Sequence, residues 1–216
     1  MDPIVCTYVV EEPIFSEAAG FKLAAAMGSK WLETNAEDPL LAEWLDSGYR
    51  KHLRRAKASV FKRLIEEIPG TVVTDDRGAR LWASPLTRAT KIPNLVKRLQ
   101  MSNFSFRTVE PLTSLMLQDD SVQIVVDRNL DMSFGKAGIA VAHASQNLTL
   151  ALRELDPTSL DIWRSRGYPV LPFRGEFLKG DEPTAIVEDH GLTEVEAGAI
   201  TAKAFFVHRR HTIEKD

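Results

Sequence analysis

The chain has 216 residues, of which 44% are hydrophobic and 26% charged, as in an ordinary soluble protein of one large or two small domains. Cys6 is the single cysteine, which excludes an internal disulfide, and the five scattered histidines do not have the spacing of a structural zinc site. No apolar run reaches the roughly 20 residues that cross a bilayer, and residues 1–3 do not begin like a signal peptide. We therefore expect a cytoplasmic protein without membrane contact.

The net charge of −3 does not by itself indicate a polyanion as partner, but the charge is unevenly distributed. The first 117 residues carry a net charge of +2, and the remaining residues carry −5. Positive charge is concentrated in residues 50–63, which contain seven basic residues and no acidic one. This local patch is more informative than the overall charge.

Short β-branched runs predict strands, and helical apolar spacing predicts helices, along the first half of the chain. An alanine-rich helix follows the first predicted strand and runs to Leu32. A long helical segment is expected over Pro39–Ile68, with a possible break at Gly48. In chain order, the other elements expected in this half are the strand Ile4–Val10, a strand at Gly70–Val73, a helix at Lys91–Gln100 and a strand at Phe104–Val109.

One face of the expected long helix is strongly basic, and two interpretations of it remain open. Such a face is usually the solvated side of a helix whose other side is buried. Uncompensated cations in this density would also attract the phosphates of RNA. The candidate RNA-binding residues are Arg50, Lys51, Arg54, Arg55 and Lys57.

The second half repeats the pattern of the first. Val122–Val126 and Ile200–Val207 predict strands, Tyr168–Leu171 a further strand, and Pro183–His190 a helix. Sliding the chain onto itself by 116 residues needs no gap between the first strand and helix of each half. The coinciding pairs are Val9 with Val125, Val10 with Val126, Ala24 with Ala140, Ala26 with Ala142, Ser29 with Ser145 and Leu32 with Leu148. Gly70–Val73 also resembles Tyr168–Leu171.

Alternating strands and helices predict an α/β fold. We interpret the repeat as a duplication that gives two similar three-layer units, each a small mixed sheet flanked by helices, joined as a pseudo-dimer. The units are expected over residues 1–117 and 118–216, with the boundary near Leu112–Asp120. The alternative is that two buried strand–helix segments share a pattern without common origin.

Gly135–Lys136 opens the alanine-rich helix of the second half. A lysine at a helix start adds positive charge where the backbone already carries partial positive charge, so it benefits from a bound anion or a developing oxyanion. His143 follows seven residues later, about two helical turns, on the same face. The residues Phe134–Ala137 lack the glycine spacing and hydroxyl of a P-loop, which disfavours a nucleotide-binding enzyme.

The segment Met132–Ala144 resembles the signature M-x-K-G-K-x-A-A-Q-x-x-H-A of type II peptidyl-tRNA hydrolases. Its matching residues are Leu130, Met132, Gly135, Lys136, Ile139, His143 and Ala144. A second segment is similar to the family's D-A-G-x-T-E-[IV]-x-x-G-[ST]-x-T loop. There the matches are Asp189, Gly191, Thr193, Glu194, Val195, Gly198 and Thr201. Together the signatures span about residues 120–207.

Several positions depart from the family pattern. Phe134 replaces its first lysine, Ala140 its glutamine, Ala199 a hydroxyl residue, and Asp127 an arginine that is instead found one step later, at Arg128. In the first half, Gly20 and Met27 stand where Lys136 and His143 stand in the second. These departures leave a second possibility, a non-catalytic binding or regulatory module on the same fold.

The resemblance implies hydrolysis of the ester that joins a peptide to the 3′-terminal ribose of tRNA, without a metal or cofactor. It implies Lys136 as stabiliser of the oxyanion and Asp189 as the residue that orients or deprotonates water or holds Lys136 in place. Thr193 is expected to hydrogen-bond the substrate or the water. His143, Thr201 and Arg128 are the expected substrate-binding residues, although His143 also fits a core position behind its helix. The implied partner is tRNA, and the pseudo-dimer leaves room for further homo-oligomers.

Overall fold

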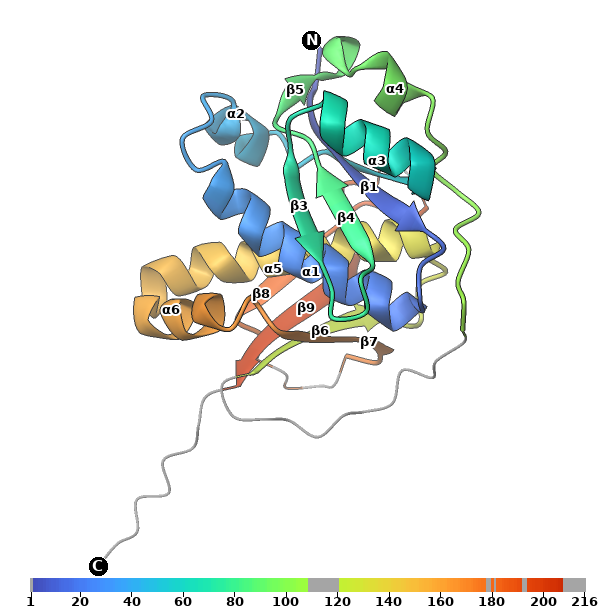
Figure 1. Ribbon diagram of the computed structural model, residues 1–216. Helices are drawn as coiled ribbons and strands as arrows, with labels where there is room; N and C mark the ends of the chain where they lie inside the picture. The colour runs from blue at the N-terminus through green and yellow to red at the C-terminus, as the bar shows by residue number, and fades with distance from the viewer. Residues whose placement is uncertain (1, 109–120, 178–179, 181, 192–193, 208–216) are drawn as a thin grey trace, which may run out of the picture.

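The computed structural model describes residues 2–108, 121–177, 180, 182–191 and 194–207, and contains two mixed sheets with helices between and beside them (Figure 1). The first sheet has the strand order β2-β1-β4-β3, with β5 also pairing with β1. Its strands are β1 Ile4–Glu12, β2 Lys51–Lys57, β3 Thr71–Thr74, β4 Arg80–Ala83 and β5 Thr87–Arg88. The second sheet has the order β7-β6-β9-β8, with β6 Ser121–Asp127, β7 Val170–Gly175, β8 Ala185–Glu188 and β9 Ile200–Val207.

Apart from β5, which has no counterpart among the described strands of the second sheet, the two sheets have the same topology. In each, the first strand pairs in parallel with the second (β1 with β2, β6 with β7) and antiparallel with the last (β4 or β9). The last strand also pairs antiparallel with the remaining one, β3 or β8. The expectation of an α/β protein with two similar mixed-sheet units is therefore confirmed. The expected boundary at Leu112–Asp120 lies outside the described residues.

The two long helices, α1 Glu17–Thr34 and α5 Phe134–Leu155, cross each other between the sheets (Figure 1). The short helices α2 Leu41–Asp46 and α6 Pro157–Ser165 follow them. Helix α3 Ala58–Glu67 packs on β1 and β2 through a separate cluster of buried side chains. The 3-10 helix η1 Ala89–Lys91 and the helix α4 Asn94–Lys97 complete the first unit.

Helices α1 and α5 meet through residues that the repeat makes equivalent. The hydroxyls of Ser29 and Ser145, 116 positions apart, are 2.6 Å from each other, and both side chains are buried. Ser145 Oγ donates to the carbonyl of Ala25 at 2.7 Å, and Thr149 Oγ1 donates to Ser29 Oγ at 2.9 Å. Small residues allow this close approach, since a Cβ on Gly28 would lie 2.5 Å from the carbonyl oxygen of Ala142.

A second repeated motif, a tryptophan followed by a glycine–tyrosine turn, comes after each long helix. The indole of Trp44 donates to the carbonyl of Arg50 at 3.1 Å, and that of Trp163 donates to the carbonyl of Pro169 at 3.0 Å. The motif ends in Gly48–Tyr49 in the first unit and in Gly167–Tyr168 in the second, and all four residues have positive φ. Each tyrosine ring packs edge-on against the tryptophan of its own motif. The chain reverses here because both residues adopt the left-handed conformation.

This second repeat corrects the expected long helix over Pro39–Ile68. The Gly48–Tyr49 turn ends α2, and the chain continues as β2 before α3 begins at Ala58. The spacing of apolar residues suggested one helix because α2 and α3 are both helical and β2 is short. The proposed equivalence of Gly70–Val73 with Tyr168–Leu171 is also wrong, since β7 corresponds to β2 and β3 corresponds to β8.

Other expected elements differ in detail. Pro183–His190 is not helical but contains β8, which pairs with β9. Phe104–Val109 forms no strand in its described part, where Phe106 makes only an isolated bridge to Ile14. The helix expected at Lys91–Gln100 is reduced to α4. The strands β1, β3, β6 and β9 and the helices α1 and α5 are found where the sequence places them.

The contact between α1 and α5 can be tested with one glycine in each helix. Gly28→Ala is expected to lower the free energy of unfolding, because overpacking costs about 1–3 kcal/mol and exceeds the gain of up to about 1 kcal/mol in helix propensity. Gly138→Ala is the matched control, since its new Cβ would meet only the end of the Leu53 side chain, at 3.3 Å. Urea denaturation measures both, and equal effects would contradict the proposed packing.

Candidate functional site

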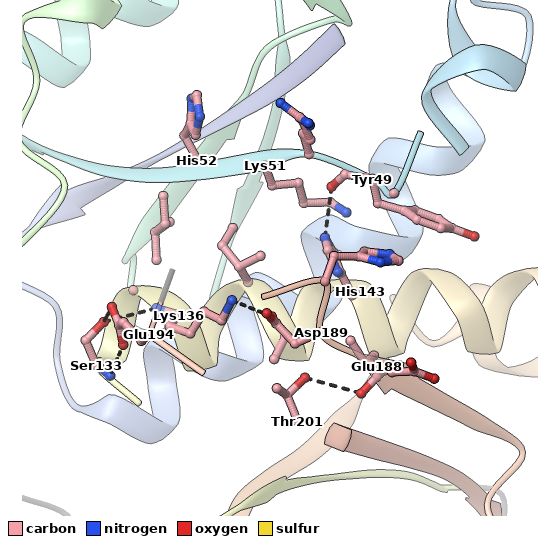
Figure 2. Close-up of a pocket in the computed structure, with 18 of the residues that line it drawn as sticks. Tyr49, Lys51, His52, Ser133, Lys136, His143, Glu188, Asp189, Glu194 and Thr201 are labelled. Carbon is pink, nitrogen blue, oxygen red and sulfur yellow. Dashed lines mark hydrogen bonds and ion pairs between the residues drawn. The ribbon is translucent and has the colours of Figure 1, made fainter. Parts of the chain in front are cut away.

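A cavity of about 570 Å³ lies where the two units meet (Figure 2). One wall comes from the first unit, residues 48–53 around the start of β2. The other comes from the second unit, the first three turns of α5 and the strands and loop of β8 and β9. Side chains from both units therefore face one space.

The amine of Lys136 forms an ion pair with the carboxylate of Asp189 inside this cavity (Figure 2). The two side chains are only 15% and 13% exposed, so water screens their interaction weakly. Asp189 is fixed independently of the lysine. Its second carboxylate oxygen accepts the N–H of Gly191 at 2.8 Å, and its backbone bonds to Gly198 and Ala199 close the turn after β8.

The start of α5 is bound to the β8–β9 loop at a second point. Ser133 is the N-cap, and its Oγ accepts the N–H of Lys136 at 3.2 Å. The carboxylate of Glu194 accepts both the N–H and the O–H of Ser133, each at 2.7 Å. A carboxylate at a helix N-terminus is favourable, and here it also holds the loop that carries Asp189 against the helix that carries Lys136.

His143 lines the same cavity two turns along α5 and is bound to the first unit. Its Nε2 lies 3.0 Å from the carbonyl oxygen of Tyr49, and its ring packs 5.7 Å from the Tyr49 ring. Burial, followed by the nearby charge of Lys51, holds the pKa of His143 well below its ordinary value. The imidazole is thus neutral, with the proton on Nε2 and Nδ1 left as an acceptor.

The structure brings three of the expected site residues together, Lys136, Asp189 and His143. Thr201 also lines the cavity, but it is buried and its hydroxyl donates to the carbonyl of Val187 at 3.3 Å. Thr193 lies outside the described residues. Arg128 is not part of the cavity, since it is largely exposed and pairs with Glu176.

Phe134, which replaces the family's first lysine, faces the first unit instead of the cavity. Its ring stacks on Phe21 with centroids 5.6 Å apart and meets Phe104 and Phe106 edge-on. A Cβ on Gly20 would lie 2.5 Å from this ring. Phe134 is therefore an aromatic contact between the units, and Gly20 is small because the ring covers it.

The five candidate RNA-binding residues, Arg50, Lys51, Arg54, Arg55 and Lys57, do not form one helical face. They lie on or just before β2, where Arg54 donates to the carbonyl of Leu99 at 2.7 Å and Arg55 pairs with Glu12 at 2.6 Å. Arg50 is exposed at the cavity, and Lys57 is exposed on the strand end. The local pattern of charge indicated a surface, but Arg54 and Arg55 bind other segments of the first unit instead.

Lys51 differs from the other basic residues. Its amine lies 4.5 Å from the centre of the Trp44 ring and 5.4 Å from that of Tyr49, and it lines the cavity. The nitrogen is buried and has no hydrogen-bond partner among the described residues. Burial holds the pKa of Lys51 well below its ordinary value. From the sequence, Lys51 was expected on an RNA-binding face. The recurrence of tryptophan, glycine and tyrosine in the second half is the pattern that could have placed Lys51 beside these aromatic rings instead.

The fold and site define an α/β protein of two similar units, with a composite cavity that holds a lysine–aspartate pair and a neutral histidine. In the described ranges, no cluster of His, Cys, Asp or Glu is arranged to hold a metal ion. None of the helices described combines the length and the apolar character needed to cross a bilayer.

The chain is 28% identical over 94 residues to the peptidyl-tRNA hydrolase of Sulfolobus acidocaldarius, an alignment that covers 36% of this chain and 78% of that protein. No family model matches the chain, and no solved structure matches it.

The neutral His143 predicts a pH dependence of stability. At pH values between the lowered pKa of His143 in the folded state and its ordinary value near 6.5, this histidine is protonated in the unfolded chain but neutral in the folded protein. The free energy of unfolding should therefore rise with pH through this window, by up to about 1.4 kcal/mol per pH unit. In His143→Gln the slope should be smaller, as measured by urea denaturation from pH 5 to 7. The exposed His190→Gln should change the slope much less, because His190 is the last and smallest of the named causes that lower the pKa of His143. Equal slopes in all three proteins would contradict a neutral His143.

Proposed function

We propose that this protein hydrolyses the ester bond of peptidyl-tRNA, or of a related N-blocked aminoacyl ester. The observation that carries the proposal is the Lys136–Asp189 ion pair, which faces a cavity from the two segments that resemble the type II peptidyl-tRNA hydrolase signatures. The similarity to the Sulfolobus acidocaldarius peptidyl-tRNA hydrolase supports the same activity.

In the proposed reaction, a water molecule lies against Asp189 and adds to the ester carbonyl carbon. Asp189 accepts the proton of this water as the new C–O bond forms. The carbonyl oxygen becomes an oxyanion, which the ammonium of Lys136 stabilises at a position where water screens charge weakly. The bond to the ribose oxygen then breaks as this oxygen takes the proton back from Asp189, which restores the carboxylate. The released peptide acid loses its remaining proton to solvent, so the products are a free peptide carboxylate and the tRNA 3′ hydroxyl.

The first unit supplies the wall along which we propose that the tRNA end approaches. Arg50 is exposed at the edge of the cavity, where a guanidinium can contact a phosphate of the terminal nucleotides. Lys57 extends positive charge along β2, together with Arg54 and Arg55, which also bind Leu99 and Glu12. The role proposed for these residues is electrostatic attraction without sequence preference.

The second candidate is a non-catalytic binding module. Ala199 favours it, because it lacks the hydroxyl of the family pattern beside the Asp189 turn. The loss of a lysine at Phe134 argues less for it, since Phe134 serves a contact between the units and the cavity keeps Lys136 and Lys51.

A hydrolysis assay separates the two candidates. Purified protein should release the blocked amino acid from N-acetyl-aminoacyl-tRNA, and Lys136→Ala should lower kcat by about 100-fold or more. Asp189→Asn should also lower kcat, although the amide oxygen can still accept the N–H of Gly191 and keep the turn. Lys22→Ala, an exposed lysine on α1, is the control. A folded wild-type protein without activity would leave the binding module as the function.

Arg50 can be tested through salt dependence. Arg50→Ala should weaken tRNA binding and should reduce the slope of log K against log salt concentration by about 1, because one phosphate contact is lost. Filter binding at four or five salt concentrations measures the slope, again with Lys22→Ala as control. An unchanged slope would remove Arg50 from the RNA contact.

A further inference from the structure

The amine of Lys51 is placed at the cavity by an aromatic cage built from its own unit. Trp44 and Tyr49 hold it from one side, and their positions are fixed by the Trp44 hydrogen bond and by the left-handed Gly48–Tyr49 turn. Figure 2 shows Lys51 on the wall opposite Lys136 and Asp189, with His143 beneath it. Two lysines from different units thus face the cavity.

The second unit provides an internal control for the role of this lysine. Its cage of Trp163 and Tyr168 has the same hydrogen bond, the same turn and the same edge-on ring pair. The strand after it starts at Val170, which pairs with Val122 as Lys51 pairs with the equivalent Cys6. The fold is therefore satisfied by an apolar side chain at this position, and the amine of Lys51 is not needed to build the cage.

A buried amine without a hydrogen-bond partner destabilises a protein. Stability alone therefore gives no reason for the lysine, whereas a ligand oxygen would supply the missing partner and would favour the charged amine. Strongly perturbed groups of this kind are concentrated at functional sites. Beside Lys51 the cavity is lined by Tyr49, Leu53 and Ile139, surroundings that suit a carbon-bearing acyl group better than a phosphate. Phosphates are better served by the exposed Arg50.

We propose that Lys51 binds the acyl end of the substrate, donating to its carbonyl oxygen before cleavage and to the carboxylate of the released product afterwards. This proposal rests on the proposed function, since it names which part of an N-blocked aminoacyl ester lies against the first unit. Lys136 and Asp189 then act on the reacting carbonyl from the opposite wall. The cavity is accordingly incomplete without the first unit.

Calorimetric titration of the full chain with N-acetylalanine, which carries the product carboxylate, tests the proposal without any need for hydrolysis. The wild-type protein should bind it, and Lys51→Met should bind it at least tenfold more weakly. The exposed Lys22→Met is the control for loss of a lysine charge and should bind as the wild type does. N-acetylalanine amide keeps a neutral carbonyl and lacks the carboxylate, so it should bind the wild type more weakly than N-acetylalanine does and should lose less affinity in Lys51→Met. The affinity for inorganic phosphate should not depend on Lys51.

Thermal unfolding distinguishes a ligand-binding lysine from a structural one. Lys51→Met should keep or raise the Tm, because methionine places an apolar side chain where the second unit has Val170 and removes an unpartnered amine. A lower Tm, an unchanged affinity for N-acetylalanine, or a Lys51-dependent affinity for phosphate instead would each overturn the proposal. If the wild type binds N-acetylalanine through Lys51 but cleaves no tRNA ester, the hydrolase function fails and the carboxylate site stands. If it cleaves the ester and Lys51→Met does so equally well, the inference fails alone.

Discussion

The close contact of α1 with α5 is the constraint on which the rest of the structure depends. Equivalent small residues of the two helices, with Ser29 and Ser145 at the centre, let two similar units share one core. This contact places the wall around Lys51 opposite the start of α5. If the helices were a side chain further apart, His143 could not reach the carbonyl of Tyr49, and the cavity would open into a gap between the units.

The sequence predicts the fold well where the repeat is free of gaps. A constant shift of 116 residues covers β1 and α1 against β6 and α5, and these elements form where expected. The prediction of elements fails after these helices. There the tryptophan–glycine–tyrosine motif recurs at a shift of 119 residues and so does not align when the chain is shifted by 116. Without it, the apolar residues on both sides of Gly48 appear as one helical stripe, and β2 is hidden within it.

The candidate site was partly predictable for a related reason. Lys136, His143 and Asp189 lie in two motifs of the second unit, and the structure brings them to one cavity. The contributions of Lys51 and of the Tyr49 carbonyl could not be read from those motifs, because they arise from contact between units. The true role of Phe134 was equally hidden, since its partners Phe21, Phe104 and Phe106 belong to the other half of the chain.

The turns after β3 and β8 are built alike, but the residues around them differ between the two units. Asp75 closes the turn after β3 through the same backbone bonds, to Gly78 and Ala79, that Asp189 makes to Gly198 and Ala199. The aspartate is thus part of the turn in both units, whereas a lysine faces it only in the second, because Gly20 makes room for Phe134. Conversely, the caged lysine occurs only in the first unit, where Lys51 stands in place of Val170. The lysine that faces the aspartate turn and the lysine beside the tryptophan thus come from different units, and both line the cavity between them.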